Sequence, residues 1–271
     1  MKRRKSTMLL AIGIIALIAG IYAVGAIMPD ANLYADFHRK GLPPSIEHPF
    51  GTDLLGRDML TRTMKGLSLS LFVGLASSGA AALIALVLGV LAAFGGGWVD
   101  HLINWLIDLF MGIPHTLLLI LISIAAGRGW RGLMIGMIFT HWPSLARIIR
   151  GEVSQIRSSH YIAASQKLGR SNWWVMSRHI FPHMVPQLLM GLVLLFPHAI
   201  MHESGLTFLG FGLPPEQPAI GIILAESMRH LSSGMWWLSI FPGLALASMV
   251  LLIDGLGECI KLLQDPKTAQ G

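Results

Sequence analysis

The residues best suited to chemistry lie in FPHAIMHESGLTFLG, residues 196–210, an otherwise apolar stretch. It contains His198, His202 and Glu203. Residues four apart in a helix are separated by about 40° around its axis, so His198 and His202 share a face and can bind one ion. Neutral imidazole suits Ni, Cu, Zn and Co. Glu203, about 100° from His202, is expected to meet another helix or the mouth of a path.

These polar side chains also have a structural interpretation. A polar residue in a membrane helix can simply hydrogen-bond to a neighbouring helix, typically for about 0.6 kcal/mol. Ionisable residues in spans usually face the bundle interior or a water-filled cavity, which favours contact with a transported ion. Both interpretations stay open for His198 and His202. We interpret His101, His115 and His160 as isolated boundary or packing residues.

The composition places the chain in a membrane. Of its 271 residues, 54% are hydrophobic and 13% charged, whereas a soluble domain carries about 25% charged residues. The 20 Lys and Arg outnumber the 14 Asp and Glu. They lie at the ends of apolar runs, which indicates cytoplasm and lipid headgroups and excludes a nucleic-acid role. The single cysteine, Cys259, excludes an intrachain disulfide and a multi-cysteine metal site.

Six stretches are candidates for membrane spans, since about 20 mostly apolar residues cross the hydrocarbon core. They are residues 8–28, 69–94, 102–125, 131–148, 185–206 and 237–257. The second span is rich in Ala, Gly and Ser, which let helix backbones approach closely. Pro114 is expected to bend the third span, and Arg131, His141 and Pro143 interrupt the fourth.

Charge predicts the orientation of these spans. Residues 2–5 are basic and precede an uncharged run longer than the core of a signal peptide, so an uncleaved helix with a cytoplasmic N-terminus is expected. Residues 147–178 hold six basic residues against one acidic residue, which predicts a cytoplasmic loop. Residues 29–66 balance five basic against five acidic residues, as an exported segment can. Six spans place both termini in the cytoplasm.

The basic loop SSHYIAASQKLGRSNWWVMSRHIFPHMVPQ predicts a helix, a break and a second helix. YIAASQKL has helical spacing, Gly169 can end the first helix, and Ser171 or Asn172 can cap the second. Pro182 and Pro186 mark the start of the fifth span. On the residues alone, an amphipathic hairpin on the membrane surface fits this pattern.

This loop resembles the cytoplasmic EAA loop of binding-protein-dependent ABC importer permeases. The matching residues are Tyr161, Ala164, Leu168, Gly169, Arg178, His179, Ile180 and Pro182. Ala163 stands in place of the Glu that names the motif, and Ser165 in place of its second Ala. In that family the short helix docks in a groove of the ATPase subunit. The resemblance therefore implies ATPase coupling through Tyr161, Ala163, Ala164, Leu168 and Gly169.

Other segments extend this resemblance to residues 48–266. HPFGTDLLGRDMLTRTMKG, residues 48–66, is similar to the segment before the second span in C-type permeases of the dipeptide, oligopeptide and nickel importer family. ESGLTFLGFG, residues 203–212, and the WW and PGLAL motifs within 236–246 resemble the later spans. The resemblance implies an all-α, polytopic type I ABC importer permease fold with six transmembrane helices.

The implied organisation has two parts. Residues 1–68 form an N-terminal transmembrane helix and exported segment, and residues 69–271 form the permease core, with the EAA-type loop at about 151–184. The implied partners are a homologous permease subunit, giving a heterodimer, two ATPase subunits or domains, an extracytoplasmic binding protein and membrane lipid. The implied location is the bacterial inner membrane.

The motifs that the chain lacks agree with a transport subunit rather than an enzyme. Neither GxxxxGK[ST] nor HExxH occurs in the sequence, so it has no phosphate loop of that kind and no zinc protease motif. We therefore expect no cofactor on this chain, with ATP and Mg used by the partner ATPase.

The exported segment contains GTDLLGRD, residues 51–58. Asp53, Arg57 and Asp58 suit a turn held by local salt bridges. The resemblance places this segment near the outer face, where a binding protein would dock. Both interpretations can hold together, because a docking surface must itself be ordered.

Family membership leaves the cargo open. Nickel-import permeases carry a similar His-x-x-x-His before the FLG motif, and THW at 140–142 also looks like that branch. We therefore expect import of nickel or a nickel chelate by ATP-driven alternating access, with His198, His202 and Glu203 in the path and the two histidines as metal ligands. Import of dipeptides or oligopeptides is the alternative. A membrane-embedded metalloenzyme with a metal site at the same three residues is an alternative of another class.

Overall fold

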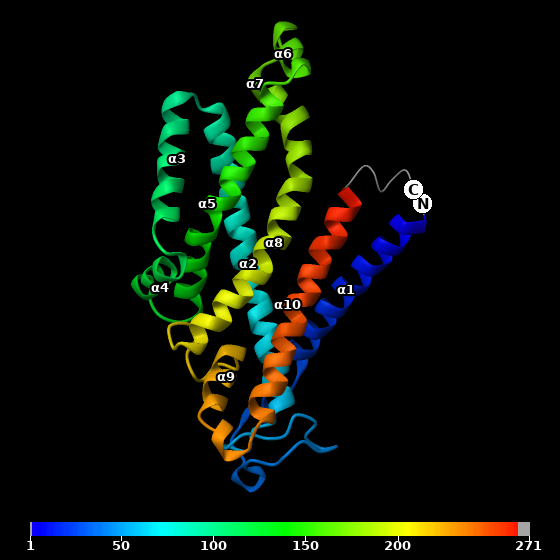
Figure 1. The fold of residues 1–271 in the computed structure, drawn as a ribbon, viewed down its shortest axis with the longest axis vertical. Coiled ribbons are helices and arrows are strands. Elements are labelled where there is room, and N and C mark those ends of the chain that lie inside the picture. Colours follow the sequence, from blue (N-terminus) through cyan, green and yellow to red (C-terminus); the bar gives the residue numbers. More distant parts are fainter. Residues whose placement is uncertain (1, 265–271) are drawn as a thin grey trace.

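The computed structural model describes residues 2–264, and its regular structure there is helical (Figure 1). An isolated bridge between Thr52 and Asp58 is the exception. The helices of eight residues or more are α1 (Lys2–Ile27), α2 (Met59–Phe94), α3 (Gly97–Gly112), α4 (His115–Ala125), α5 (Trp130–Arg157), α6 (His160–Lys167), α8 (Phe181–Phe208), α9 (Ile220–Met228) and α10 (Trp237–Gln264). The four-residue α7 (Asn172–Val175) precedes α8. The predicted all-α fold is confirmed. Residues 265–271 of the predicted permease core lie outside the described residues.

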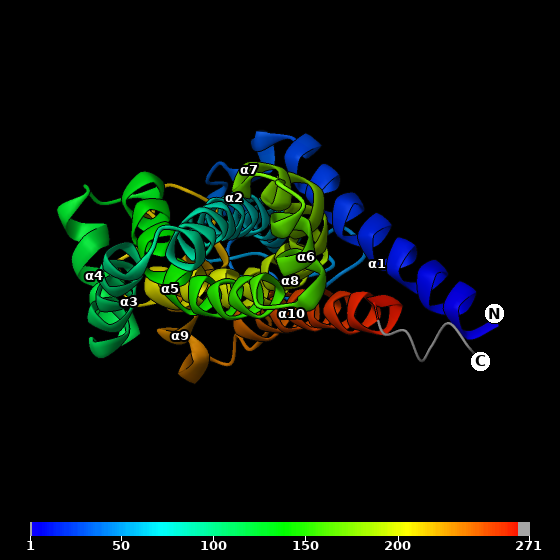
Figure 2. The same cartoon turned by 90° about the horizontal axis from the view of Figure 1, so that it is seen from above.

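Helix α2 is the central element, because it packs against α1, α5 and α8 (Figures 1 and 2). Its small residues make this possible. A Cβ atom at Gly74 would lie 2.7 Å from Ile200 Cγ1 of α8, and one at Gly89 would lie 2.8 Å from Ile149 Cγ2 of α5. The close backbone approach predicted for residues 69–94 is therefore confirmed.

The predicted third span, residues 102–125, is two helices rather than one. Helices α3 and α4 meet at an angle of 98°. Ile113 lies between them with φ −95° and ψ 137°, an extended conformation. The ring of Pro114 disfavours a helical conformation at the preceding residue. The predicted bend at Pro114 is confirmed, but it breaks the helix completely.

Length and apolarity do not confirm the count of six spans. Within residues 2–264, four helical stretches pass both criteria, at α1, α2, residues 172–208 and α10, and the bent α3–α4 pair brings the number to five. Helix α5 contains the predicted span 131–148 and has 28 residues, but it is absent from that set. It packs against α2, α3, α4 and α8, so protein contacts surround much of its surface.

The ends of the helices separate the loops into two groups (Figure 1). The start of α1 and the end of α10 point toward the same end of the molecule as α6 and α7. Residues 29–58 and α9 lie at the opposite end. This arrangement agrees with the predicted grouping of the basic loop with both termini, and it separates them from the exported segment. Which end faces the cytoplasm stays a prediction.

The contact between α2 and α8 can be tested with two glycines of α2. We expect Gly74→Ala to lower the unfolding temperature of the detergent-purified chain, because the new methyl group overlaps Ile200, and overpacking costs about 1–3 kcal/mol. Gly79→Ala is the matched control, since no described atom lies within 4 Å of a Cβ at that position. Equal unfolding temperatures for the two variants would contradict this packing.

Candidate functional site

A cavity of about 550 Å³ lies between the α3–α4 corner, α5 and α8. Among the described residues that line it, none is charged. They are Phe110, Met111, Gly112, Ile113, Pro114, His115, Thr140, His141, Pro143, Ser144, Leu195, His198 and His202. The imidazole rings are therefore the main polar groups of this cavity.

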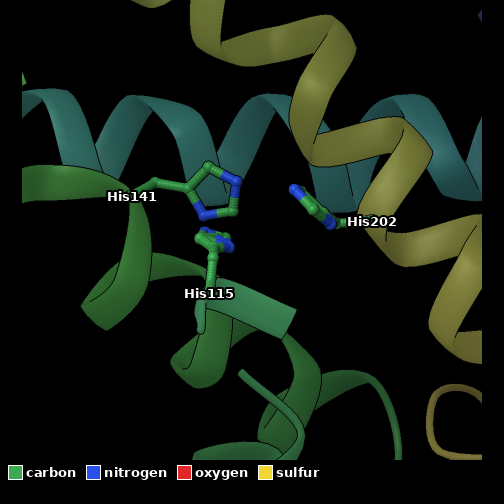
Figure 3. Close-up of side chains that lie close together, drawn as sticks. All are labelled: His115, His141 and His202. Carbon is green, nitrogen blue, oxygen red and sulfur yellow. The ribbon is translucent and has the colours of Figure 1, made fainter. Parts of the chain in front are cut away.

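Three of these histidines converge from three helices, as Figure 3 shows. His115 belongs to α4, His141 to α5 and His202 to α8. One ring nitrogen from each lies within 4.8 Å of the other two. The centroid of the His115 ring lies 4.6 Å from that of His202, with the rings stacked, and 4.8 Å from that of His141, edge to face. The arrangement is suited to holding a metal ion.

Local backbone features bring these rings together. His115 is the first residue of α4, directly after the Pro114 corner. Gly136 lets α5 approach α4, since a Cβ there would lie 3.0 Å from the carbonyl oxygen of Leu119. Gly191 of α8 likewise allows α5 to approach closely, since a Cβ at Gly191 would lie 2.5 Å from Leu145 Cδ1 of α5. Small residues and one proline thus position the cavity.

The structure groups His202 differently from the sequence prediction. His198 and His202 line the same cavity, but the compact set of nitrogens joins His202 to His115 and His141. The interpretation of His115 as an isolated residue is therefore wrong. Its position after a proline inside a span was the available signal. Binding of an ion by His198 and His202 stays a prediction.

Glu203 does not line the histidine cavity. It is 0% exposed. Its carboxylate accepts hydrogen bonds from Ser70 of α2, and from Ser204 and Thr207 at 3.1 Å each. The prediction that Glu203 meets another helix is confirmed. It ties α8 to α2 and is not among the cavity-lining residues, so its place in a substrate path stays a prediction.

The basic loop folds as a helix, a break and a helix. Helix α6 is followed by Gly169 with φ +80°, and the Ser171 hydroxyl accepts a hydrogen bond of 3.2 Å from Trp174 N–H at the start of α7. Both features were predicted. The predicted start of the fifth span at Pro182 and Pro186 is confirmed for Pro182, which lies in the first turn of α8, whereas Pro186 lies inside that helix. Helix α8 also continues a longer helical stretch that covers residues 172–208. A π-turn at residues 176–180, closed by a hydrogen bond from Phe181 N–H to the Met176 carbonyl, precedes Pro182.

The predicted coupling residues are all exposed on this loop. They are Tyr161, Ala163, Ala164, Leu168 and Gly169. Leu168 is the extreme case, with 82% of its surface exposed. Ile162 is the buried residue of α6 and anchors the helix. An apolar side chain held outward beside a turn is available for docking, while the ATPase contact itself stays a prediction.

The exported segment is held by ion pairs. Asp53 accepts hydrogen bonds from Arg57 Nε at 2.6 Å and from Arg62 NH1 at 2.7 Å. Asp58 caps α2 by accepting a hydrogen bond of 2.8 Å from Thr61 N–H, and it also contacts His48 Nδ1 at 3.0 Å. The predicted turn with local salt bridges is confirmed. A docking role for Asp53, Arg57 and Asp58 stays a prediction.

Sequence reasoning missed two members of this network. Arg62 of α2 is 3% exposed at its side chain, and its NH2 lies 2.8 Å from Glu226 Oε2 of α9. Arg57 NH2 reaches the same oxygen at 3.2 Å. Glu226 is 164 residues away from Arg62 in sequence, so local spacing carried no signal for this contact. The network connects the exported segment to α2 and α9.

Long apolar helices around a histidine-lined cavity, with an exposed helical turn at one end, fit a membrane transport subunit. Residues 85–269 match the family model described as "Binding-protein-dependent transport system inner membrane component". Because this match covers more than half of the chain, the chain belongs to that family. It is a permease subunit of a binding-protein-dependent ABC importer, a transport component rather than an enzyme.

Several curated relatives match most of the chain. The dipeptide transport system permease protein of Bacillus subtilis strain 168 is 32% identical over 88% of this chain and 75% of its own length. The oligopeptide transport system permease protein of the same strain is 31% identical over 98% and 88%. The glutathione transport system permease protein of Pectobacterium atrosepticum is 31% identical over 94% and 84%. Two of these names refer to peptide transport and the third to glutathione transport, and none of the three mentions nickel.

The ion network predicts the behaviour of the exported segment. Arg62→Met should speed hydrogen–deuterium exchange across residues 36–58, because it leaves buried Asp53 with one cation fewer, and breaking a buried pair costs about 3–5 kcal/mol. Arg39→Met is the control, since its pair with Asp36 is exposed and worth about 0–1 kcal/mol. Unchanged exchange in the Arg62 variant would refute this role.

Proposed function

We propose that this chain forms half of the translocation path of the importer, pairs with a homologous permease subunit and is driven by two ATPase subunits or domains. The observation that carries this proposal is the protruding α6–Gly169 unit, with Leu168 exposed at its tip. In this proposal the ATPase groove receives α6. ATP and Mg belong to the ATPase, and this chain binds no cofactor for hydrolysis.

The connections of α6 supply a route for the motion. Helix α5 ends at Arg157 and α6 begins at His160, while the second half of the loop continues into α8. Helix α5 carries His141 and helix α8 carries His202. A displacement of α6 therefore acts on two walls of the histidine-lined cavity. In this proposal, alternating access follows from ATP-driven displacement of α5 and α8, which opens and closes the cavity that they line.

Helix α3 is expected to move with α5. Arg150 of α5 forms a bidentate ion pair with Asp100 of α3. A second pair joins Arg147 to Asp108, about one turn away on α5 and about two turns away on α3. A bidentate arginine–carboxylate pair fixes orientation as well as distance. We infer that α3 and α5 form one moving unit, with the corner at Pro114 as one edge of the cavity.

The opposite end is proposed as the docking face for the extracytoplasmic binding protein. The ion network of Asp53, Arg57, Arg62 and Glu226 holds the exported segment against α2 and α9. Asp58 fixes the start of α2. A binding protein that presses on this ordered segment would therefore act directly on α2, the helix that contacts both cavity-lining helices α5 and α8.

For the cargo, we propose di- or oligopeptides ahead of nickel. The named substrates of the relatives support peptide import, and no relative described above supports the nickel preference expected from the sequence. A cavity of about 550 Å³ is large enough for a small peptide. Nickel chelate import is a second candidate because three histidines converge in that cavity.

Uptake into proteoliposomes that contain the complete importer tests both candidates. A labelled dipeptide and labelled nickel are each supplied outside with the binding protein and ATP. We expect ATP-dependent uptake of the peptide. Uptake of nickel alone would replace the first candidate with the second, and ATP-independent accumulation of either would contradict the importer mechanism.

Coupling can be tested at Gly169. Gly169→Val should keep ATP hydrolysis but reduce uptake per ATP by roughly tenfold, because a β-branched residue does not tolerate φ +80° and the α6 turn must change shape. Gly97→Val is the control: its φ is not positive and no described atom lies within 4 Å of its Cβ. Full coupling in the Gly169 variant would count against docking through this turn.

A further inference from the structure

We propose that His115, His141 and His202 form a binding site for a divalent transition-metal ion. The three residues come from α4, α5 and α8, and one nitrogen from each lies within 4.8 Å of the others (Figure 3). This trio differs from the His198–His202 pair expected from helical spacing. It also concerns binding by this chain alone, so it holds whichever cargo the importer carries.

The hydrogen bonding of His141 prepares it as a ligand. Its Nδ1 lies 2.8 Å from the carbonyl oxygen of Met137. A carbonyl oxygen can only accept, so Nδ1 carries the proton and Nε2 keeps its lone pair. Metal-binding histidines are commonly oriented in this way by a backbone carbonyl.

That Nε2 atom is buried without a protein partner. His141 is 6% exposed. Within the described part of the chain, its Nε2 and the Nδ1 of His115 have no hydrogen-bond partner. Leaving a buried polar atom unsatisfied costs about 1–3 kcal/mol. The ring contacts of His115 and His141 supply neither nitrogen with a hydrogen bond, so a bound ligand would give these buried atoms a partner.

The donor set selects the class of metal. Neutral imidazole nitrogen suits Ni, Cu, Zn and Co, whereas Mg and Ca prefer oxygen ligands. Three protein donors leave coordination positions for water or a cargo group from the adjoining cavity. Glu203 does not enter this set, since its carboxylate is engaged by Ser70, Ser204 and Thr207.

Binding should also draw helices together. Nitrogens around a tetrahedral ion with bonds of 2.0–2.1 Å are about 3.3 Å apart, compared with up to 4.8 Å here. The rings must therefore move inward by about 1 Å. The three ligands lie on α4, α5 and α8, so an ion would link the α4 corner to both helices proposed to transmit motion from α6.

The test uses the complete importer, purified through a tag that contains no histidine. Equilibrium dialysis with NiCl₂ or ZnCl₂ should reveal a site that MgCl₂ does not occupy. X-ray absorption on the unmodified protein should show imidazole nitrogens at about 2.0–2.1 Å from the metal. A spectrum without imidazole ligands would overturn the proposal, and this measurement does not depend on any variant folding correctly.

The variants identify which histidines bind. His115→Gln, His141→Gln and His202→Gln should each weaken metal affinity at least roughly tenfold. His101→Gln is the control, because His101 is an exposed histidine of α3 outside the cavity lining. If His198→Gln abolished binding while His115→Gln did not, the pair on α8 would be the site and the trio would be wrong.

Uptake in the same preparations keeps the two proposals separate. Metal binding without ATP-dependent uptake would leave the trio standing and remove the proposed importer mechanism. Peptide uptake without selective metal binding would support the importer mechanism and refute the metal site. In addition, metal should raise the unfolding temperature of the unmodified protein and of the His101 variant but not of the three trio variants.

Discussion

The absence of water in the bilayer core constrains the polar groups buried within the spanning helices, because an unpaired group in hydrocarbon costs several kcal/mol. Glu203 meets this constraint with three hydroxyl donors, one of them on α2. At the end of the molecule that carries residues 29–58, buried Arg62 is paired with Asp53 and Glu226. Each of these polar contacts also connects two helices: Glu203 joins α8 to α2, and Arg62 joins α2 to α9. The polar groups therefore determine which helices stay together, in a fold where lipid offers no hydrophobic force between them.

Two kinds of contact hold the helices of the bundle together. Close backbone approaches and the Glu203 hydrogen bonds hold α8 and α5 against α2, whereas charged pairs hold α3 to α5. The histidine cavity lies where these helices meet. Its walls come from the α3–α4 corner, α5 and α8, of which α5 and α8 lead directly from the α6–α7 loop. A ligand held in this cavity would contact all three walls.

Much of the fold could be predicted from sequence because its signals are local. Apolar length located four of the six predicted spans, small residues identified α2 as a close-packing helix, and Gly169 with Ser171 predicted the break in the loop. The angle between α3 and α4 could not be predicted, since Pro114 excludes a helical conformation at Ile113 without setting the new direction. Helix α5 illustrates a second limit: its polarity reflects protein neighbours that a hydropathy window does not include.

The candidate site shows the same limit more sharply. Helical spacing correctly placed His198 and His202 on one cavity, but spacing along one helix cannot identify a ligand on another. His115 and His141 lie 87 and 61 residues before His202 in the sequence, and the close packing at Gly136 and Gly191 connects α4 to α5 and α5 to α8. The Met137 carbonyl that orients His141 lies four residues before it.

Peptide cargo and a metal site need not compete for this cavity. Its volume of about 550 Å³ far exceeds that of a single ion, and the described residues that line it provide no carboxylate to balance a divalent charge. Peptides bring a carboxylate and backbone donors of their own, which can occupy the coordination positions that three histidines leave open. The neutral imidazoles would then bind the metal ion, and the rest of the cavity would accommodate the peptide that chelates it. Such a division of roles would make the proposed metal site at the histidine trio compatible with the peptide transport named for two of the relatives.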